Sequence, residues 1–179
     1  TFVATDNEET AEIARSLGTE CPFLRPKSLS EPYVNLETVQ QFALGEIEKS
    51  GLYPDLVVHL EETFPYRGKG MIDKMINHLL KEGYDSVIAA RPESSFLWQE
   101  NEQGNFVRLD SGDVPRKFKE KSYVGLHGLG VVTHPEFIRQ ERMLGDKVGL
   151  YPVHSPLAGF EVRDKESRQI AETFQDNFI

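Results

Sequence analysis

The feature that most constrains the fold is the alternation of short apolar segments with amphipathic segments along the 179-residue chain. Segments 55–60, 86–90 and 128–133 are almost entirely apolar, which is typical of strands covered on both faces of a sheet. Segments 34–47 and 71–80 carry apolar residues at helical spacing, so helices are predicted there. Together these segments predict an α/β fold, with a doubly wound, mostly parallel sheet.

Both ends of the chain continue this pattern. A short β-branched strand is predicted over 1–5, followed by a helix that carries Ile13, Ala14 and Leu17 and ends at Gly18. The second half is expected to add a helix over 135–143, short strands over 148–153 and 160–162, and a closing helix with Ile170, Ala171 and Phe174 on one side.

One segment breaks the alternation. Residues 96–99 and 105–109 flank the turn residues 102–104, a pattern that predicts a β-hairpin. No internal repeat or linker divides the chain. We therefore expect residues 1–179 to form one domain, into which the hairpin segment 92–121 is inserted.

The composition excludes several classes of protein. The net charge of −9 argues against a dedicated nucleic-acid-binding protein. No apolar run approaches the ~20 residues that a membrane-spanning helix needs, and we see no secretion signal. The single cysteine, Cys21, cannot form an internal disulfide, which favours a reducing, cytoplasmic location.

In doubly wound sheets, ligands bind beyond the carboxyl ends of the strands, so the loops after the predicted strands are the candidate sites. The loop 61–67 follows a buried strand and contains two carboxylates, a hydroxyl and a guanidinium. Arg67 or Thr63 could hold an anionic substrate there, because guanidinium suits carboxylate and phosphate. A solvated turn is the alternative.

Two further charged groups have similar alternatives. The basic cluster 116–121 could bind a carboxylate or phosphate, or be an exposed loop. The acidic residues Glu161, Asp164 and Glu166 could hold Mg²⁺, or could stabilise the start of a helix through its dipole.

Other catalytic signatures are missing from the sequence. It contains no phosphate-binding P-loop, no GxGxxG and no GxSxG, which weakens the kinase, dehydrogenase and α/β-hydrolase interpretations. The five histidines show no metal-ligand spacing, and His59, within an apolar strand, is expected to be a satisfied core residue.

Three segments resemble motifs of one family. They are VATDNEE at residues 3–9, FLRPKSL at 23–29 and VVHLEETFPYR at 57–67. They are similar to motifs of the acylneuraminate cytidylyltransferases, also called CMP-sialic acid synthetases. The resemblance implies a nucleotide-diphospho-sugar transferase-like domain with a dimerising hairpin. It also implies Mg²⁺-dependent transfer of CMP from CTP to a 2-keto sugar acid, with release of pyrophosphate, by a homodimer.

The resemblance also implies roles for individual residues. The residues that would bind the nucleotide are Asp6, Arg25 and Asn35. The residues that would bind the acceptor are Glu61, Thr63, Arg67, Arg116 and Lys119. The residues that would serve catalysis are Arg67 and Glu161, and those that would hold the metal are Glu161 and Asp164.

The sequence departs from the family pattern in three places. Glu61 stands where the family has a glutamine that touches the sugar, and Arg163 replaces a metal-binding aspartate. Nothing corresponds to the family's Gly-rich basic loop, so we expect the complete protein, or a partner, to supply that segment. These departures keep open a non-catalytic binding or assembly module, and also a nucleotidyltransferase with a different sugar or nucleotide.

Overall fold

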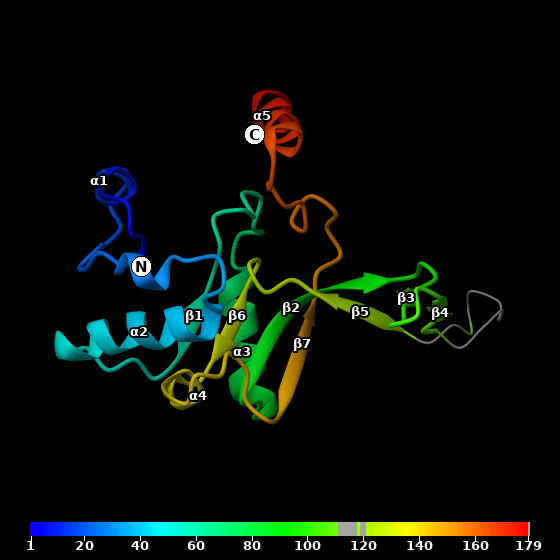
Figure 1. The fold of residues 1–179 in the computed structure, drawn as a ribbon, viewed down its shortest axis with the longest axis horizontal. Coiled ribbons are helices and arrows are strands. Elements are labelled where there is room, and N and C mark those ends of the chain that lie inside the picture. The colour runs from blue at the N-terminus through cyan, green and yellow to red at the C-terminus, as the bar shows by residue number, and fades with distance from the viewer. Residues whose placement is uncertain (111–117, 119–120, 179) are drawn as a thin grey trace.

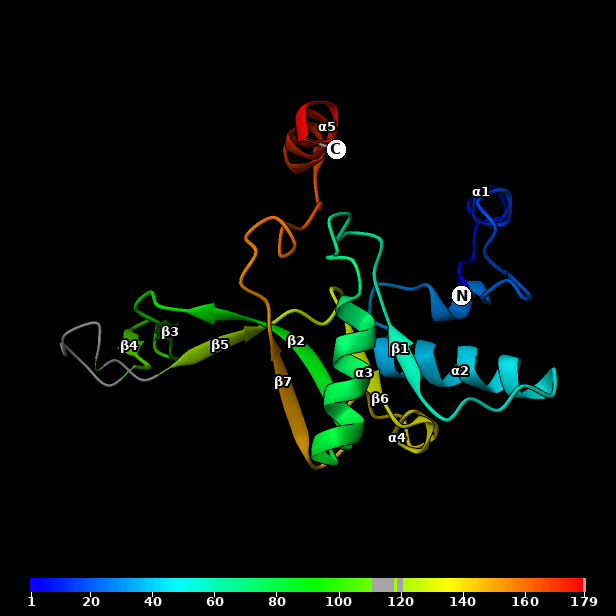
Figure 2. The ribbon, with the colours of Figure 1, turned by 180° about the vertical axis from the view of Figure 1, so that it is seen from behind.

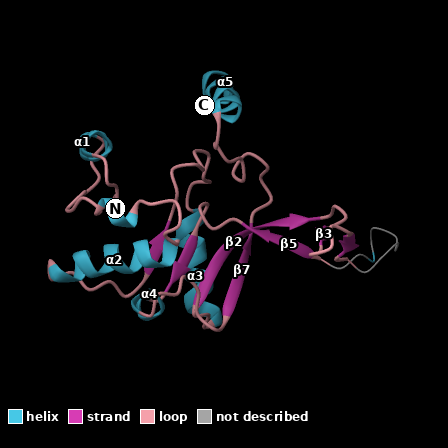
Figure 3. Cartoon of the chain, in the orientation of Figure 1, coloured by secondary structure: helices cyan, strands magenta, loops and turns pink. Residues whose placement is uncertain are grey.

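The computed structural model describes residues 1–110, 118 and 121–178, and Figures 1 and 3 show its helices and strands. In chain order they are α1 (Glu8–Ser16), the 3₁₀ helix η1 (Lys27–Leu29), α2 (Leu36–Lys49), β1 (Val57–His59), α3 (Met71–Glu82), β2 (Ser86–Glu93), β3 (Trp98–Glu100), β4 (Phe106–Arg108), β5 (Ser122–Gly125), β6 (Val131–Thr133), α4 (Pro135–Arg139), β7 (Val148–Pro152) and α5 (Lys165–Phe178). Among these residues, every helix is too short or too polar to cross a lipid bilayer.

The central sheet confirms the predicted α/β class but corrects its strand directions. The strand order is β1-β6-β2-β5, and β7 also pairs with β2. Strand β6 is antiparallel to both β1 and β2, and β5 is antiparallel to β2. Among the described ladders, only β2 and β7 pair in parallel. The expectation of a mostly parallel sheet is therefore wrong for these ladders, because β6 runs in the opposite direction between β1 and β2.

Helix α3 covers one face of this sheet (Figure 2). Met71, Met75 and Leu79 recur at helical spacing on its inner side and are buried against Val87 of β2 and Val132 of β6. Burying a side chain of this size stabilises the fold by about 1.5–3 kcal/mol. The predicted apolar stripe of 71–80 is thus the main contact between helix and sheet.

The opposite face has its own small core. Ile88, Val131 and Met143 are buried there, and Leu36 at the start of α2 and Leu144 pack against them. Successive strand residues point to opposite faces, which is why β2 and β6 contribute side chains to both cores. Helices on both faces of one sheet give the layered arrangement that the sequence predicts (Figures 1 and 2).

A buried polar contact joins the start of β2 to the end of β6. The hydroxyls of Ser86 and Thr133 lie 2.7 Å apart, and the Gly145 N–H donates to Ser86 Oγ over 2.9 Å. Both side chains are buried, so this network satisfies groups whose desolvation would otherwise destabilise the fold. It ties β2, β6 and the loop before β7 together.

Several predicted elements are shorter than expected or not formed. The strand predicted over 1–5 is not formed. Its residues make two isolated parallel bridges instead, Phe2 with Glu20 and Thr5 with Leu24. Residues 160–162 form no strand, since their backbone turns toward the loop after β1 instead. The helix predicted over 135–143 ends at Arg139, and β7 forms as expected.

Helix α1 forms where predicted, but its apolar residues are not its buried face. Ala11 is its buried residue, whereas Ile13 and Leu17 are exposed. Figures 1 and 2 agree that α1 and α5 both stand away from the sheet.

The predicted hairpin is confirmed over its described part. Strands β3 and β4 pair antiparallel, with Trp98 opposite Arg108. Trp98 is 58% exposed and Phe106 is 69% exposed, so the hairpin formed by β3 and β4 presents aromatic side chains to solvent. Part of the predicted inserted segment, residues 111–117 and 119–120, lies outside the described residues.

Candidate active site

The candidate site lies where the loop after β1 meets the turn before β6. Because β6 is antiparallel to β1, the end of β1 and the start of β6 lie at one edge of the sheet. The Glu61 N–H donates to the Gly128 carbonyl over 2.8 Å. Residues 61–67 and 126–129 are therefore held together at the position where α/β sheets bind ligands.

Arg67 fastens these two segments through backbone acceptors. Its Nε donates to the Leu129 carbonyl over 2.8 Å, and its Nη2 donates to the carbonyls of Glu61 and Gly128 over 2.9 and 3.1 Å. Burial lowers the pKa of Arg67, yet a guanidinium remains charged at neutral pH. The predicted role of Arg67 in substrate binding stays a prediction, and the structure gives it a positioning role.

Glu61 and His59 project from the same side of the strand end. His59 Nε2 is buried, has no hydrogen-bond partner among the described residues and lies 3.5 Å from Glu61 Oε1. Burial lowers the pKa of His59, and the neighbouring Glu61 offsets this only in part. The prediction that His59 is a satisfied core residue is therefore wrong, because its side chain is 16% exposed and its buried Nε2 has no hydrogen-bond partner among the described residues. Its lowered pKa keeps the imidazole neutral near pH 7. Thr63 Oγ1 lies 3.4 Å from Glu61 Oε2.

A third segment reaches the same edge from the start of α5. The Val162 N–H donates to the Thr63 carbonyl over 2.8 Å. Beside it, Arg163 Nη2 lies 2.6 Å from Glu161 Oε1, and this contact raises the pKa of Arg163. The structure therefore brings Glu161 into the neighbourhood of the loop 61–67, as the sequence predicts.

The two residues predicted to hold Mg²⁺ have other partners. Glu161 is paired with Arg163, and Asp164 accepts the Ser167 N–H over 2.7 Å as the cap of α5. Within the described part of the chain, no three His, Cys, Asp or Glu side chains are grouped so that they could hold a metal ion. The described residues do not fit a protein-built magnesium centre.

The predicted nucleotide-binding residues fall into two groups. Arg25 Nη2 lies 3.5 Å from Asp6 Oδ1, so the structure brings these two together. Asn35 occupies the N-cap position of α2, where its side chain makes no capping hydrogen bond, and lines a cavity of about 480 Å³ with His127 and Arg142. The predicted acceptor-binding residues Arg116 and Lys119 lie outside the described residues.

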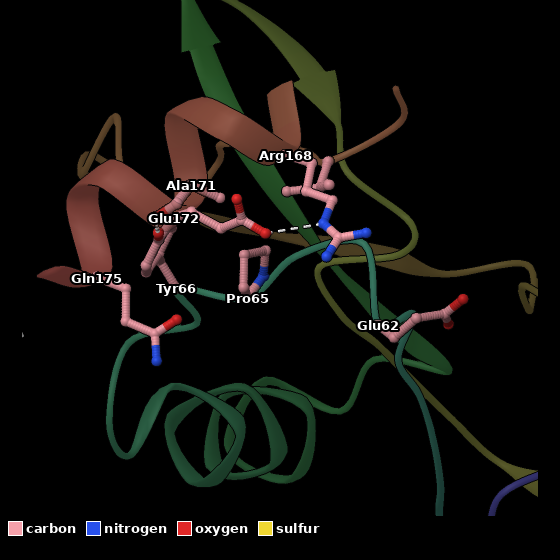
Figure 4. Close-up of a pocket in the computed structure, with 8 residues that line it drawn as sticks. Glu62, Pro65, Tyr66, Arg168, Ala171, Glu172 and Gln175 are labelled. Atoms are coloured by element: carbon pink, nitrogen blue, oxygen red, sulfur yellow. Dashed lines mark hydrogen bonds and ion pairs between the residues drawn. The ribbon is translucent and has the colours of Figure 1, made fainter. Parts of the chain in front are cut away.

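The sequence did not predict a second cavity, of about 380 Å³, between the loop after β1 and α5 (Figure 4). Tyr66 reaches across and its hydroxyl donates to the Ala171 carbonyl. Arg168 and Glu172 line the cavity and form an ion pair of 2.9 Å, drawn as a dashed line in Figure 4. From the sequence, the i,i+4 spacing of Arg168 and Glu172 could predict that they lie on one face of a helix. It could not predict that this face lines a cavity.

Solved structures share this fold. A CMP:2-keto-3-deoxy-manno-octonic acid synthetase complexed with CTP matches with a TM-score of 0.67 and 9% identity, over 99% of this chain and 81% of that chain. A 4-diphosphocytidyl-2C-methyl-D-erythritol synthase from Anaerococcus prevotii matches with a TM-score of 0.64 and 14% identity, over 98% and 78%. The fold of the chain is therefore the one seen in these two enzymes.

Sequence comparison points to a narrower group. An N-acylneuraminate cytidylyltransferase A of Danio rerio is 26% identical over 155 residues, covering 84% of this chain and 35% of the relative. A pseudaminic acid cytidylyltransferase of Campylobacter jejuni is 30% identical over 126 residues, covering 68% and 50%. No model of a known protein family matches the chain. The chain spans half or less of these relatives' length, and the resemblance to acylneuraminate cytidylyltransferases is confirmed at low identity.

Proposed function

We propose that the protein transfers CMP from CTP to a 2-keto sugar acid and releases pyrophosphate. The observation that carries this proposal is that the sequence similarity and the fold similarity point to related reactions. The chain is similar in sequence to sialic and pseudaminic acid cytidylyltransferases, and similar in fold to a synthetase solved with CTP. The reaction joins two anions, so cationic groups must neutralise charge while the acceptor hydroxyl attacks phosphorus.

The proposal divides the roles of the residues between two regions. Asp6, Arg25 and Asn35 would bind the nucleotide. The edge formed by Glu61 and Thr63 would contact the acceptor, and the predicted acceptor-binding cations Arg116 and Lys119 would bind its carboxylate. Arg67 would hold that edge in place, because three backbone carbonyls already accept its hydrogen bonds.

The proposal includes a requirement for Mg²⁺. The described residues form no metal centre by themselves. Magnesium is commonly held by one or two carboxylates together with substrate phosphates. Glu161 would be the carboxylate that contributes, on release from Arg163. A cytoplasmic location is also part of the proposal, in keeping with the free thiol of Cys21.

A homodimer is the third part of the proposal. The exposed aromatic residues of β3 and β4 support it, because large exposed apolar patches mark interaction sites. A second copy of the chain that binds to the β3–β4 hairpin would cover Trp98 and Phe106.

The test is pyrophosphate release from CTP by the protein, with and without Mg²⁺, across a panel of 2-keto sugar acids. We expect release only when acceptor, CTP and Mg²⁺ are all present. Isothermal titration with CTP and Mg²⁺ should show micromolar binding. A folded protein that binds no CTP would contradict the proposal and favour the assembly module, to which the Arg163–Glu161 pair and the helix-capping Asp164 also point.

A further inference from the structure

The acceptor edge of the site carries a negative charge that the described part of the chain does not neutralise. Among the carboxylates of this region, Glu161 is paired with Arg163 at 2.6 Å and Asp164 caps α5. Glu61 has a single ion-pair contact among the described residues, with His59. Because burial keeps His59 neutral near pH 7, this contact does not cancel the charge of Glu61.

The two guanidinium groups near Glu61 have other partners. Arg67 donates to the main-chain carbonyl of Glu61, not to its carboxylate, and to two further carbonyls. Arg163 lies close enough for its pKa to be raised by Glu61, but its short contact is with Glu161. His127 and Glu62 are the other titratable groups of this neighbourhood, and Glu62 adds negative charge.

The Glu61 side chain is held in one place and is accessible from solvent. It is 31% exposed, and Thr63 Oγ1 lies 3.4 Å from its Oε2. A Cβ atom at residue 128 would lie 2.6 Å from Glu61 Cδ and 2.8 Å from the buried ring of Phe64. Gly128 therefore leaves the space that the Glu61 carboxylate occupies, and any larger residue would displace it.

We propose that Glu61 selects acceptors that carry a protonated amino group. This inference rests on the proposed function and names the substrate class of the same site. An ammonium group of the acceptor next to Glu61 Oε1 or Oε2 would neutralise the carboxylate charge, which no described residue neutralises. A neutral amide at that position would still donate a hydrogen bond to the carboxylate but would lack the full positive charge of the ammonium group, so its electrostatic attraction to Glu61 would be weaker.

The experiment compares two acceptors that differ in one group. The probes are a 2-keto sugar acid with a free primary amine and the same compound N-acetylated, each assayed for pyrophosphate release at pH 7. For the unaltered protein we expect kcat/KM to favour the amine by about 10- to 100-fold, the range for one ion pair at a partly exposed site. Glu61→Gln keeps the shape of the side chain and removes its charge, so the preference should fall to within a few-fold of unity.

Two further variants make the test specific. Glu62→Gln removes a neighbouring exposed carboxylate and should leave the preference unchanged. Gly128→Ala displaces the Glu61 carboxylate without removing it and should also abolish the preference. CTP affinity, measured by titration, should be unchanged in Glu61→Gln, which shows that the variant is folded.

The outcomes separate this inference from the proposed function. Turnover of neither acceptor, with no CTP binding, overturns the proposed function. Turnover of both acceptors without preference for the amine, or a preference that survives in Glu61→Gln, overturns the selection by Glu61 and leaves the cytidylyltransferase proposal standing.

Discussion

At the scale of residues, the candidate site is organised by main-chain hydrogen bonds rather than by ion pairs. Arg67 binds three carbonyls, and the Glu61 N–H binds the Gly128 carbonyl as well. His59, by contrast, brings to the same edge a buried nitrogen that no described residue partners with a hydrogen bond. The first set of contacts fixes the loop, whereas the buried imidazole makes the stability of the fold sensitive to pH.

We expect His59 to make the fold less stable as pH falls. Burial lowers its pKa, so below its ordinary pKa of about 6.5 the unfolded chain takes up a proton that the folded chain does not. Stability is therefore present above that pH and lost below it, by at most about 1.4 kcal/mol per pH unit. Urea denaturation of the protein and of His59→Leu from pH 7 to 5 would measure the difference.

The matched control is His154→Leu, since His154 is exposed. It should leave the pH dependence of the unfolding free energy as it is in the unaltered protein. If the curves for His59→Leu and the unaltered protein run parallel, His59 is not protonated on unfolding in the way that its burial requires.

Glycine at residue 83 should be needed for the end of α3. Its φ is +61°, and alanine in that left-handed region costs about 1 kcal/mol. Gly45 lies inside α2 at an ordinary φ, and a Cβ atom added there would meet no described atom within 4 Å. Alanine at residue 45 should therefore stabilise the fold by about 0.5–1 kcal/mol. Urea midpoints that move in the same direction for both variants would contradict this account.

At the scale of elements, the sequence predicted helices and strands where the apolar pattern was strong and failed where context decided. Strand β2 and helix α3 lie where predicted, because their side chains form the core itself. The segment 160–162 was also predicted to be a strand, yet its Val162 N–H donates to the Thr63 carbonyl in the loop after β1. Such a choice between partners depends on which segments meet in space, which a single sequence does not state.

The cap of α5 gives a test of element stability. Asp164 accepts the Ser167 N–H over 2.7 Å, and its own N–H donates to Ser167 Oγ over 3.0 Å. The Ser167 hydroxyl, which donates to Asp164 Oδ1 over 2.7 Å, and the Ser167 N–H lower the pKa of Asp164, so the cap is strongest when the carboxylate is ionised and weakens as pH falls. Asp164→Ala should speed hydrogen exchange in the first turn of α5, whereas Asp164→Asn should largely preserve its protection, because asparagine also caps helices well.

The same pair of variants separates capping from metal binding. If Asp164 holds Mg²⁺ in the reaction, both variants should raise the Mg²⁺ concentration needed for pyrophosphate release. If it only caps α5, Asp164→Asn should keep the Mg²⁺ dependence of the unaltered protein. Equal loss of exchange protection in both variants would show that the capping interpretation is wrong.

At the scale of the whole molecule, the layers were predictable and the site was predictable only in part. Uninterrupted apolar runs indicated a sheet covered on both faces, and both cores exist. The antiparallel direction of β6 was not predictable, because the sequence of its three residues, Val131–Thr133, does not indicate in which direction the strand runs. Arg67 was predicted as a site residue from its position after a strand, but its hydrogen bonds to main-chain carbonyls depend on β6 lying beside that loop.

The proposed homodimer is expected to form through the β3–β4 hairpin. Trp98 and Phe106 are large, exposed and located on neighbouring strands of one hairpin. A stable interface buries about 800 Å² per partner, and a few aromatic side chains usually supply most of its affinity. Replacing both by serine should raise the dimer dissociation constant by at least about 100-fold, as sedimentation velocity over a concentration series would measure. The control replaces Tyr33 and Tyr53, which are also exposed but lie outside the hairpin, and should leave the dissociation constant unchanged. An unaltered protein that sediments as a monomer throughout the series would sink the dimer, and a dimer that survives the hairpin substitutions would place its interface on another surface.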